Sequence, residues 1–188
     1  RMPSTLSDLT TEMVKSRDTI VNQIVQTFRE IIGWHRKSFS FVVRPVEQEI
    51  LAPHYYQTIS LYRKDYAQAD AKLEVKLSEF ATLMPAHLGV KKHLWLVPSQ
   101  ESTEEHIQAP YHSAVIQLKK LRNADTPWDK LCILKDTVSA IHSSVLEYYH
   151  HYEGEIVVDD ITIGAEELLP LLMYIVIQSR FKLLESEC

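Results

Sequence analysis

Two neighbouring carboxylates, Glu166 and Glu167, open an apolar segment near the end of the sequence. The segment reads GAEELLPLLMYIVIQS from Gly164 onward, and its apolar content predicts a helix that begins at these acids. The first turn of a helix carries N–H groups without intrahelical partners and a partial positive charge, so it favours carboxylates. Acids are therefore common at this place, and a structural role in starting the helix is one interpretation. The other is that a carboxylate is presented to a positively charged partner.

Two residues around this pair are expected to shape the start of the helix. Pro170 falls in the first turn or just past it, where the loss of a backbone N–H costs least. Gly164 is expected to permit a close turn before the helix begins.

A second helix start is predicted at the segment Thr126-Pro127-Trp128-Asp129. Thr126 is a suitable cap, Pro127 suits the first turn, and Asp129 places an acid three residues after the cap. These three residues and the following Lys130 are therefore interpreted as mainly structural. Trp128 either lies on the surface as an anchor or packs against a neighbouring helix.

The usual signatures of enzymes and of metal sites are missing from the sequence. It contains no GxSxG, HExxH, CxxC, GxxxxGK[ST] or GxGxxG motif, and four glycines are too few for a phosphate-binding loop. Among nine histidines, the adjacent His150 and His151 point in different directions on a helix and have no acid or cysteine to complete a ligand set. We therefore expect no metal and no cofactor.

Charge and cysteine content limit the classes of partner. The net charge of −5 argues against nucleic acid, because a phosphate-binding face needs clustered Lys and Arg. Two cysteines, Cys132 and Cys188, are too few for a disulfide framework and point to the cytosol. The apolar run from about Leu168 to Ile177 contains Pro170 and is too short for a membrane span, so no direct membrane insertion is expected.

Helical periodicity recurs along almost the whole sequence and predicts an all-α fold. Residues 38–43 alternate weakly, but a linker or a lead-in to a helix is preferred to a strand. Pro45 is expected to open a short helix, and residues 153–164 are expected to form a loop with some β character. The other helices are predicted at about residues 6–32, 55–66, 70–84, 110–121, 126–149 and 165–187.

Five segments, in the order that the family has them, resemble the Vps-nine (vacuolar protein sorting nine) domain of guanine-nucleotide exchange factors for Rab-five-type GTPases. GAEELLPLLMYIVIQS resembles the hallmark of that family, and Thr126, Pro127, Lys130 and Leu131 match its TPxxKL helix. Upstream, FVVRPVEQEILAPHYYQTISLY, HLGVKKHLW and YHSAVIQLKKL are similar to the alsin-type version of the domain. The resemblance implies a helical arm or bundle element at residues 1–37, followed at 38–188 by the layered helical core of the domain. The family continues beyond this core, so the domain is expected to be C-terminally incomplete.

The resemblance also implies a mechanism that needs no covalent intermediate and no bound cofactor. The first acid of the hallmark, Glu166 here, enters the phosphate site of the GTPase, pairs with its phosphate-binding lysine and opposes magnesium. The other implied GTPase-binding residues, some of which the sequence equally allows in the core, are Glu167, Leu168, Pro170, Leu171 and Tyr174.

The family usually has Asp where this sequence has Glu166. This difference favours the alternative of a non-catalytic helical module that binds a Rab GTPase or scaffolds partners. Whether the chain counts as an enzyme is left open for the same reason. The resemblance implies a cytoplasmic protein recruited to early endosomes, and the sequence leaves open an oligomer formed through other regions.

Overall fold

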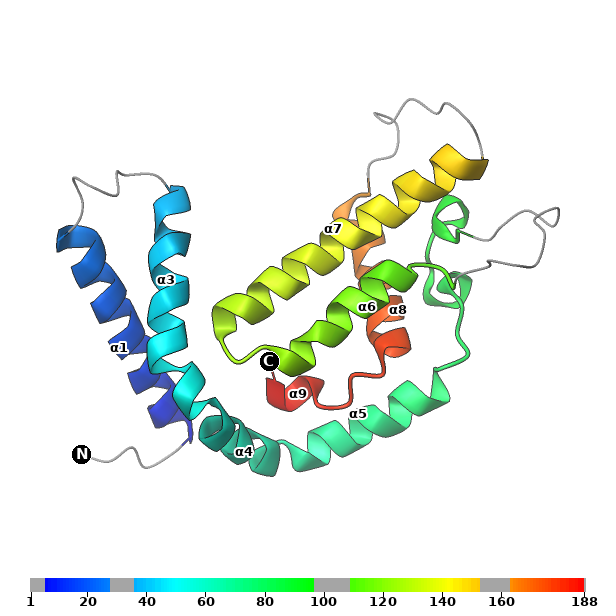
Figure 1. Ribbon diagram of the computed structural model, residues 1–188. Helices are drawn as coiled ribbons and strands as arrows, with labels where there is room; N and C mark the ends of the chain where they lie inside the picture. The colour runs from blue at the N-terminus through cyan, green and yellow to red at the C-terminus, as the bar shows by residue number, and fades with distance from the viewer. Residues whose placement is uncertain (1–5, 28–35, 97–108, 153–162, 188) are drawn as a thin grey trace. The chain divides into compact units, whose positions relative to one another are not determined.

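The computed structural model describes residues 6–27, 36–96, 109–152 and 163–187. The regular secondary structure of these residues consists of α-helices and 3-10 helices without a strand, which confirms the all-α prediction. The α-helices are α1 (Leu6–Thr27), α3 (Arg36–Ile50), α4 (Tyr55–Asp65), α5 (Ala67–Glu79), α6 (His112–Lys119), α7 (Pro127–Tyr152), α8 (Ala165–Ser179) and α9 (Leu184–Glu187) (Figure 1). Short 3-10 helices are η1 (Ala52–His54), η2 (Pro85–Leu88), η3 (Lys92–Leu94) and η5 (Lys120–Asn123).

The chain divides into two compact units that are not continuous in sequence. The first unit contains Arg1–Asp70, Asn123–Leu131 and Leu183–Cys188, and the second contains Ala71–Arg122 and Cys132–Lys182. The domain boundary predicted between residues 37 and 38 remains a prediction.

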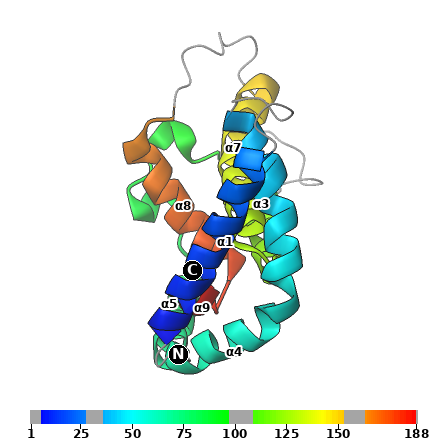
Figure 2. The same cartoon turned by 90° about the vertical axis from the view of Figure 1, so that its left-hand side faces the viewer.

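In the first unit, α1 packs against α3 (Figures 1 and 2). Val21 of α1 and Val42, Val43 and Val46 of α3 form a buried apolar cluster, and the half-buried Trp128 packs against it. Residues 38–43 form no strand, as expected, but they lie within α3 itself, so the prediction of a linker or a lead-in to a helix is wrong. Of the two alternatives for Trp128, the structure supports packing.

The prediction that Pro45 opens a helix is wrong, because it lies inside α3, nine residues after the helix begins at Arg36. Proline in a helix interior costs roughly 3 kcal/mol, because it lacks the N–H and its ring crowds the preceding turn. Pro45 itself is exposed, whereas Val43, two residues before it, and Val46, one residue after it, are buried against α1. Burial of these valines against α1 offsets the free-energy cost of the proline, so the helix continues beyond Pro45.

In the second unit, α8 packs against both α6 and η2. The core contains Leu94, Ile141, Leu171 and Ile175, all fully buried. Tyr111, just before α6, is also buried, and its hydroxyl donates a hydrogen bond of 2.6 Å to the carbonyl oxygen of Leu94. This bond satisfies the polar end of a core tyrosine and fixes the start of α6 on η3.

The helix predicted from 165 to 187 is wrong after Ser179, because α8 ends there and a separate helix, α9, follows. Arg180 adopts a left-handed backbone conformation (φ 50°, ψ 41°), which ends α8. The Arg122 guanidinium donates a hydrogen bond of 3.2 Å to the Arg180 carbonyl oxygen and lies 5.9 Å from the ring centroid of the buried Phe181. These contacts from a distant part of the sequence stabilise a chain reversal that usually needs glycine.

The remaining predicted helices agree with the structure in kind, with shifts at their ends. The helices predicted at 55–66 and 126–149 correspond to α4 and α7. The one predicted at 70–84 corresponds to the earlier and shorter α5, and the one at 110–121 to α6 and η5. The helix predicted at 6–32 is described as far as Thr27, and most of the predicted loop at 153–164 lies outside the described residues.

Candidate functional site

Gly164 caps the start of α8 in the second unit. Its carbonyl oxygen accepts hydrogen bonds from the backbone N–H groups of Glu167 (3.1 Å) and Leu168 (2.9 Å). Its backbone is extended (φ −73°, ψ 166°), and a Cβ at this position would meet only the Glu167 carboxylate, at 3.8 Å. Any residue adopts this conformation, so the turn expected at Gly164 does not depend on the conformational freedom of glycine.

The Glu167 carboxylate uses both of its oxygens within the second unit. Oε2 accepts a hydrogen bond of 2.9 Å from the Gly164 N–H, and Oε1 lies 2.6 Å from Lys91 Nζ and 4.0 Å from His93 Nε2. The bonds from Lys91 and Gly164 lower the pKa of Glu167, and Glu167 in turn raises the pKa of Lys91. The green turns of η2 and η3 lie beside the orange start of α8 (Figure 2). Glu167 thus ties the start of α8 to the segment around η3.

Glu166, the preceding residue, is exposed at the second position of α8. Its side chain forms no ion pair or hydrogen bond with any other residue in the described part of the chain. The start of the helix beside it carries free N–H groups and a partial positive charge. Glu166 therefore presents a carboxylate without an ion-pair partner to solvent from the first turn of α8.

Pro170 is the sixth residue of α8, just past the first turn, as the sequence predicted. A residue at this position normally donates its N–H to the carbonyl oxygen four residues earlier, which belongs to Glu166. Proline has no N–H to donate. The backbone carbonyl of Glu166 therefore lacks its usual helical donor.

Two of the apolar residues predicted to contact a GTPase lie in the core. Leu171 is fully buried and Tyr174 nearly so, with the Tyr174 ring packed edge-on against Tyr111 at a centroid distance of 6.3 Å. Burial also raises the pKa of Tyr174. For these two residues the structure supports the alternative of core packing, because α8 turns them toward the interior of the second unit. Leu168 is half-buried.

The exposed apolar residues of α8 are Leu169 and Met173, which the sequence interpretation missed. Their side chains are 63% and 49% exposed. Leu169 lies three residues after Glu166 and Met173 seven, so all three share one face of the helix. This spacing was visible in the sequence, but an almost wholly apolar helix does not show which face is solvent-exposed.

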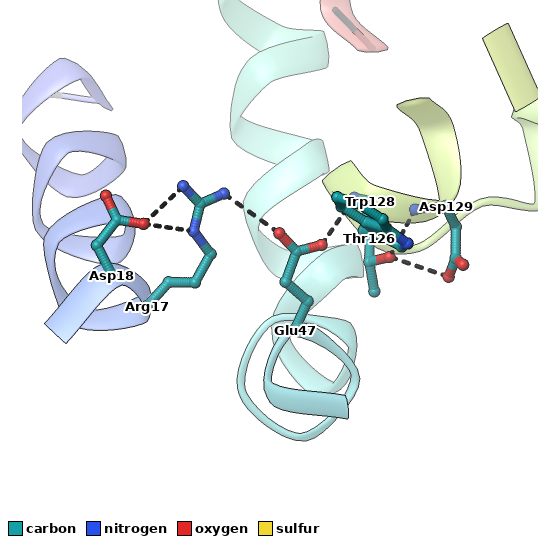
Figure 3. Close-up of polar contacts among 6 residues, drawn as sticks. All are labelled: Arg17, Asp18, Glu47, Thr126, Trp128 and Asp129. Atoms are coloured by element: carbon teal, nitrogen blue, oxygen red, sulfur yellow. Dashed lines mark hydrogen bonds and ion pairs between the residues drawn. The ribbon is translucent and has the colours of Figure 1, made fainter. Parts of the chain in front are cut away.

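The helix start at Thr126 lies in the first unit and uses its polar groups internally (Figure 3). The Thr126 hydroxyl accepts a hydrogen bond of 3.1 Å from the Asp129 N–H and donates one of 2.9 Å to the Asp129 carboxylate. Pro127 is the first residue of α7. The cap of α7 therefore forms as the sequence predicts and contributes about 1 kcal/mol.

A buried glutamate that the sequence interpretation did not single out completes this cap. Glu47 of α3 is 1% exposed, and its Oε2 accepts a hydrogen bond of 2.7 Å from the Trp128 N–H. Its Oε1 accepts a bond of 3.2 Å from Arg17, which also pairs with Asp18 (Figure 3). Glu47 thus joins α1 and α3 to the first turn of α7.

Lys130 takes part in a second internal cluster in the first unit, around Glu187. Its Nζ donates hydrogen bonds to the Glu187 carboxylate (2.7 Å) and carbonyl oxygen (2.9 Å). The carboxylate also accepts bonds from Tyr55 (2.6 Å) and Arg63 (2.7 Å). Burial raises the pKa of Glu187, but these bonds outweigh it and leave the pKa below its ordinary value. The structural interpretation of Lys130 agrees with these contacts.

Two classes of site receive no support from the described residues. They contain no group of three or more His, Cys, Asp or Glu side chains that would hold a metal ion. Within the same ranges, no helix combines the length and the apolar character that a membrane span requires.

The family model of the Vacuolar sorting protein 9 (VPS9) domain matches residues 111–188. Comparisons with curated proteins and with solved structures find no match to this chain. The matched range contains the capped start of α7 and the start of α8 with Glu166. The similarity to the alsin-type version of the domain remains a prediction. VPS9 domains interact with Rab GTPases, so the match indicates a function of the Rab exchange-factor type. Residues 111–188 are therefore a VPS9 domain, confirming the family that the sequence motifs predicted.

Proposed function

We propose that this chain promotes release of GDP from small GTPases of the Rab-five group, with Glu166 as the residue that enters the phosphate site. The observation that carries the proposal is the exposed, unpaired carboxylate of Glu166 at the start of α8, inside the matched VPS9 range. On this proposal, Glu166 pairs with the phosphate-binding lysine of the GTPase and repels the β-phosphate and the ligands of magnesium.

Electrostatics supports this role for an exposed acid. Two opposite unit charges about 4 Å apart attract by about 1 kcal/mol in water, but by about 4 kcal/mol at an effective dielectric constant of about 20. Before docking, Glu166 makes no ion pair or hydrogen bond within the described residues that a partner would have to break. Docking removes water from the pair and so strengthens an attraction that the free chain does not use.

The face of α8 that carries Glu166 supplies apolar contact area for the same docking event. Leu169 and Met173 lie on that face with more than half and about half of their side-chain surface exposed, respectively. Apolar side chains beside a charged group exclude water from it when a partner binds. We propose these two residues, rather than the buried Leu171 and Tyr174, as the apolar GTPase contacts on α8.

The test measures release of a fluorescent GDP analogue from a Rab-five-type GTPase. Glu166→Gln removes the charge and keeps the size of the side chain. Loss of one partner of a desolvated charge pair costs about 2 kcal/mol or more, so kcat/KM is expected to fall at least about 30-fold. Glu147→Gln, a change at another exposed glutamate of the second unit, is the matched control and is expected to keep the parental rate.

The alternative is a module that binds the GTPase without promoting release. It is favoured by Glu166 in place of the usual Asp, because one extra methylene moves the carboxylate by about 1.5 Å. Binding of the nucleotide-free GTPase without accelerated GDP release, in both the parent chain and Glu166→Asp, would select this alternative. We also propose a cytoplasmic location with recruitment to early endosomes, in line with a Rab-five-type partner.

A further inference from the structure

The start of α8 carries two adjacent acids, and the second unit supplies a lysine that pairs with one of them and is within reach of the charge of the other. Lys91, just before η3, forms an ion pair of 2.6 Å with Glu167 Oε1, while Glu166 has no such partner in the described residues. The two glutamates are neighbours in the first turn, so the lysine that pairs with one also lies within electrostatic range of the other. The charge of Glu166 accordingly contributes to the raised pKa of Lys91.

We propose that Glu167 is a positioning residue that holds Lys91 away from Glu166 and so keeps Glu166 available for the lysine of the GTPase. The inference rests on the proposed function, because it concerns the availability of the same carboxylate. It also gives Glu167 a role that differs from direct contact with the GTPase.

The geometry of Glu167 suits this role. Its Oε2 is held by the Gly164 N–H at 2.9 Å, which directs Oε1 toward Lys91. The Glu167 side chain is 12% exposed, whereas the Lys91 side chain is 62% exposed. The carboxylate is therefore fixed and the lysine is free to turn on its long stem. Besides Glu167, Glu166 is an acid whose charge acts on Lys91, so it is the carboxylate that we expect Lys91 to turn toward when the charge of Glu167 is removed.

Pairing of Lys91 with Glu166 would reduce exchange by competition. The GTPase lysine and Lys91 are both primary ammonium groups, and one carboxylate bound to Lys91 must release it before it pairs with the GTPase. An exposed ion pair shifts such an equilibrium by about two- to fivefold. Salt screens exposed pairs, so the effect is expected to be larger at low ionic strength.

The test uses Glu167→Gln, which keeps an oxygen for the Gly164 N–H and removes the charge that holds Lys91. Release of GDP from the Rab-five-type GTPase is measured for the parent chain, Glu167→Gln, Lys91→Met and the double variant Glu167→Gln/Lys91→Met. We expect Glu167→Gln to lower kcat/KM by about two- to fivefold at low salt, and the double variant to return to the value of Lys91→Met. Glu167→Gln/Lys92→Met removes a neighbouring exposed lysine instead and is expected to remain as slow as Glu167→Gln.

The possible outcomes separate this inference from the proposed function. If the parent chain does not release GDP, or Glu166→Gln is as fast as the parent, the proposed function fails and the inference fails with it. If Glu166→Gln is slow but Glu167→Gln is as fast as the parent, the positioning role is wrong and the proposed function stands. If removal of Lys91 does not restore the Glu167→Gln variant, Glu167 acts by itself and the inference is also overturned.

Discussion

Replacement of the buried Glu47 by alanine is expected to destabilise the first unit strongly. Its carboxylate, 1% exposed, accepts the Trp128 N–H at 2.7 Å and an N–H of Arg17 at 3.2 Å. A hydrogen bond to a charged group contributes about 1.5–3 kcal/mol, and a buried donor left without a partner adds about 1–3 kcal/mol. Arg17 is 26% exposed and keeps its pair with Asp18, so its loss of Glu47 adds little. The expected loss is therefore about 2–4 kcal/mol.

Urea unfolding followed by circular dichroism measures this loss, and Glu49→Ala provides the matched control. Glu49 is an exposed glutamate of the same helix, so its replacement is expected to change the free energy of unfolding by about 0.5 kcal/mol or less. Hydrogen exchange at the Trp128 amide gives a local readout, because this N–H is the donor that loses its acceptor. Equal unfolding free energies for Glu47→Ala and Glu49→Ala, with unchanged exchange at Trp128, would refute the assignment of Glu47 as a cap of α7.

Two further predictions concern acid stability and the exposed face of α8. The pKa of Glu187 is depressed in the folded chain, so the stability from its ionised form is present above the ordinary value of 4.5 and is lost as the pH falls below it. Urea unfolding at pH 7 and at pH 3.5 is therefore expected to differ more for the parent chain than for Glu187→Gln, and equal differences would contradict this reasoning. Leu169→Ala and Met173→Ala are expected to slow GDP release with little change in urea stability, whereas Leu171→Ala is expected to lower stability by about 2–5 kcal/mol. Slower release without loss of stability in Leu171→Ala, or unchanged release in both surface variants, would contradict the assignment of the exposed face.

Features set by neighbouring residues were predictable from the sequence. The start of α7 depends on Thr126, Pro127 and Asp129, which lie within one turn and interact through local hydrogen bonds. The start of α8 at its acids depends in the same way on residues 164–167. Local chemistry of this kind is independent of the rest of the fold.

Features set by distant contacts were not predictable. The end of α8 at Arg180 has no glycine or proline to mark it and is stabilised by Arg122, which lies 58 residues away in sequence. Continuation of α3 through Pro45 depends on burial against α1. The roles of Glu47 also depend on partners 30 and 81 residues away. In each case the structure depends on tertiary contacts, which local sequence preferences do not reveal.

The polar side chains of the two matched motifs differ in whether they already make hydrogen bonds or ion pairs inside the chain. Thr126, Asp129 and Lys130 already make hydrogen bonds inside the first unit, so a partner that recruited them would first have to break those bonds. Glu167 is committed in the same way to Gly164 and Lys91. Glu166 has no such commitment in the described residues, and docking on a cation therefore costs it the loss of water but no internal bond. The absence of internal bonds, rather than its negative charge alone, distinguishes Glu166 from the other charged residues of both motifs, and it is the reason that we propose Glu166 as the residue that meets the GTPase.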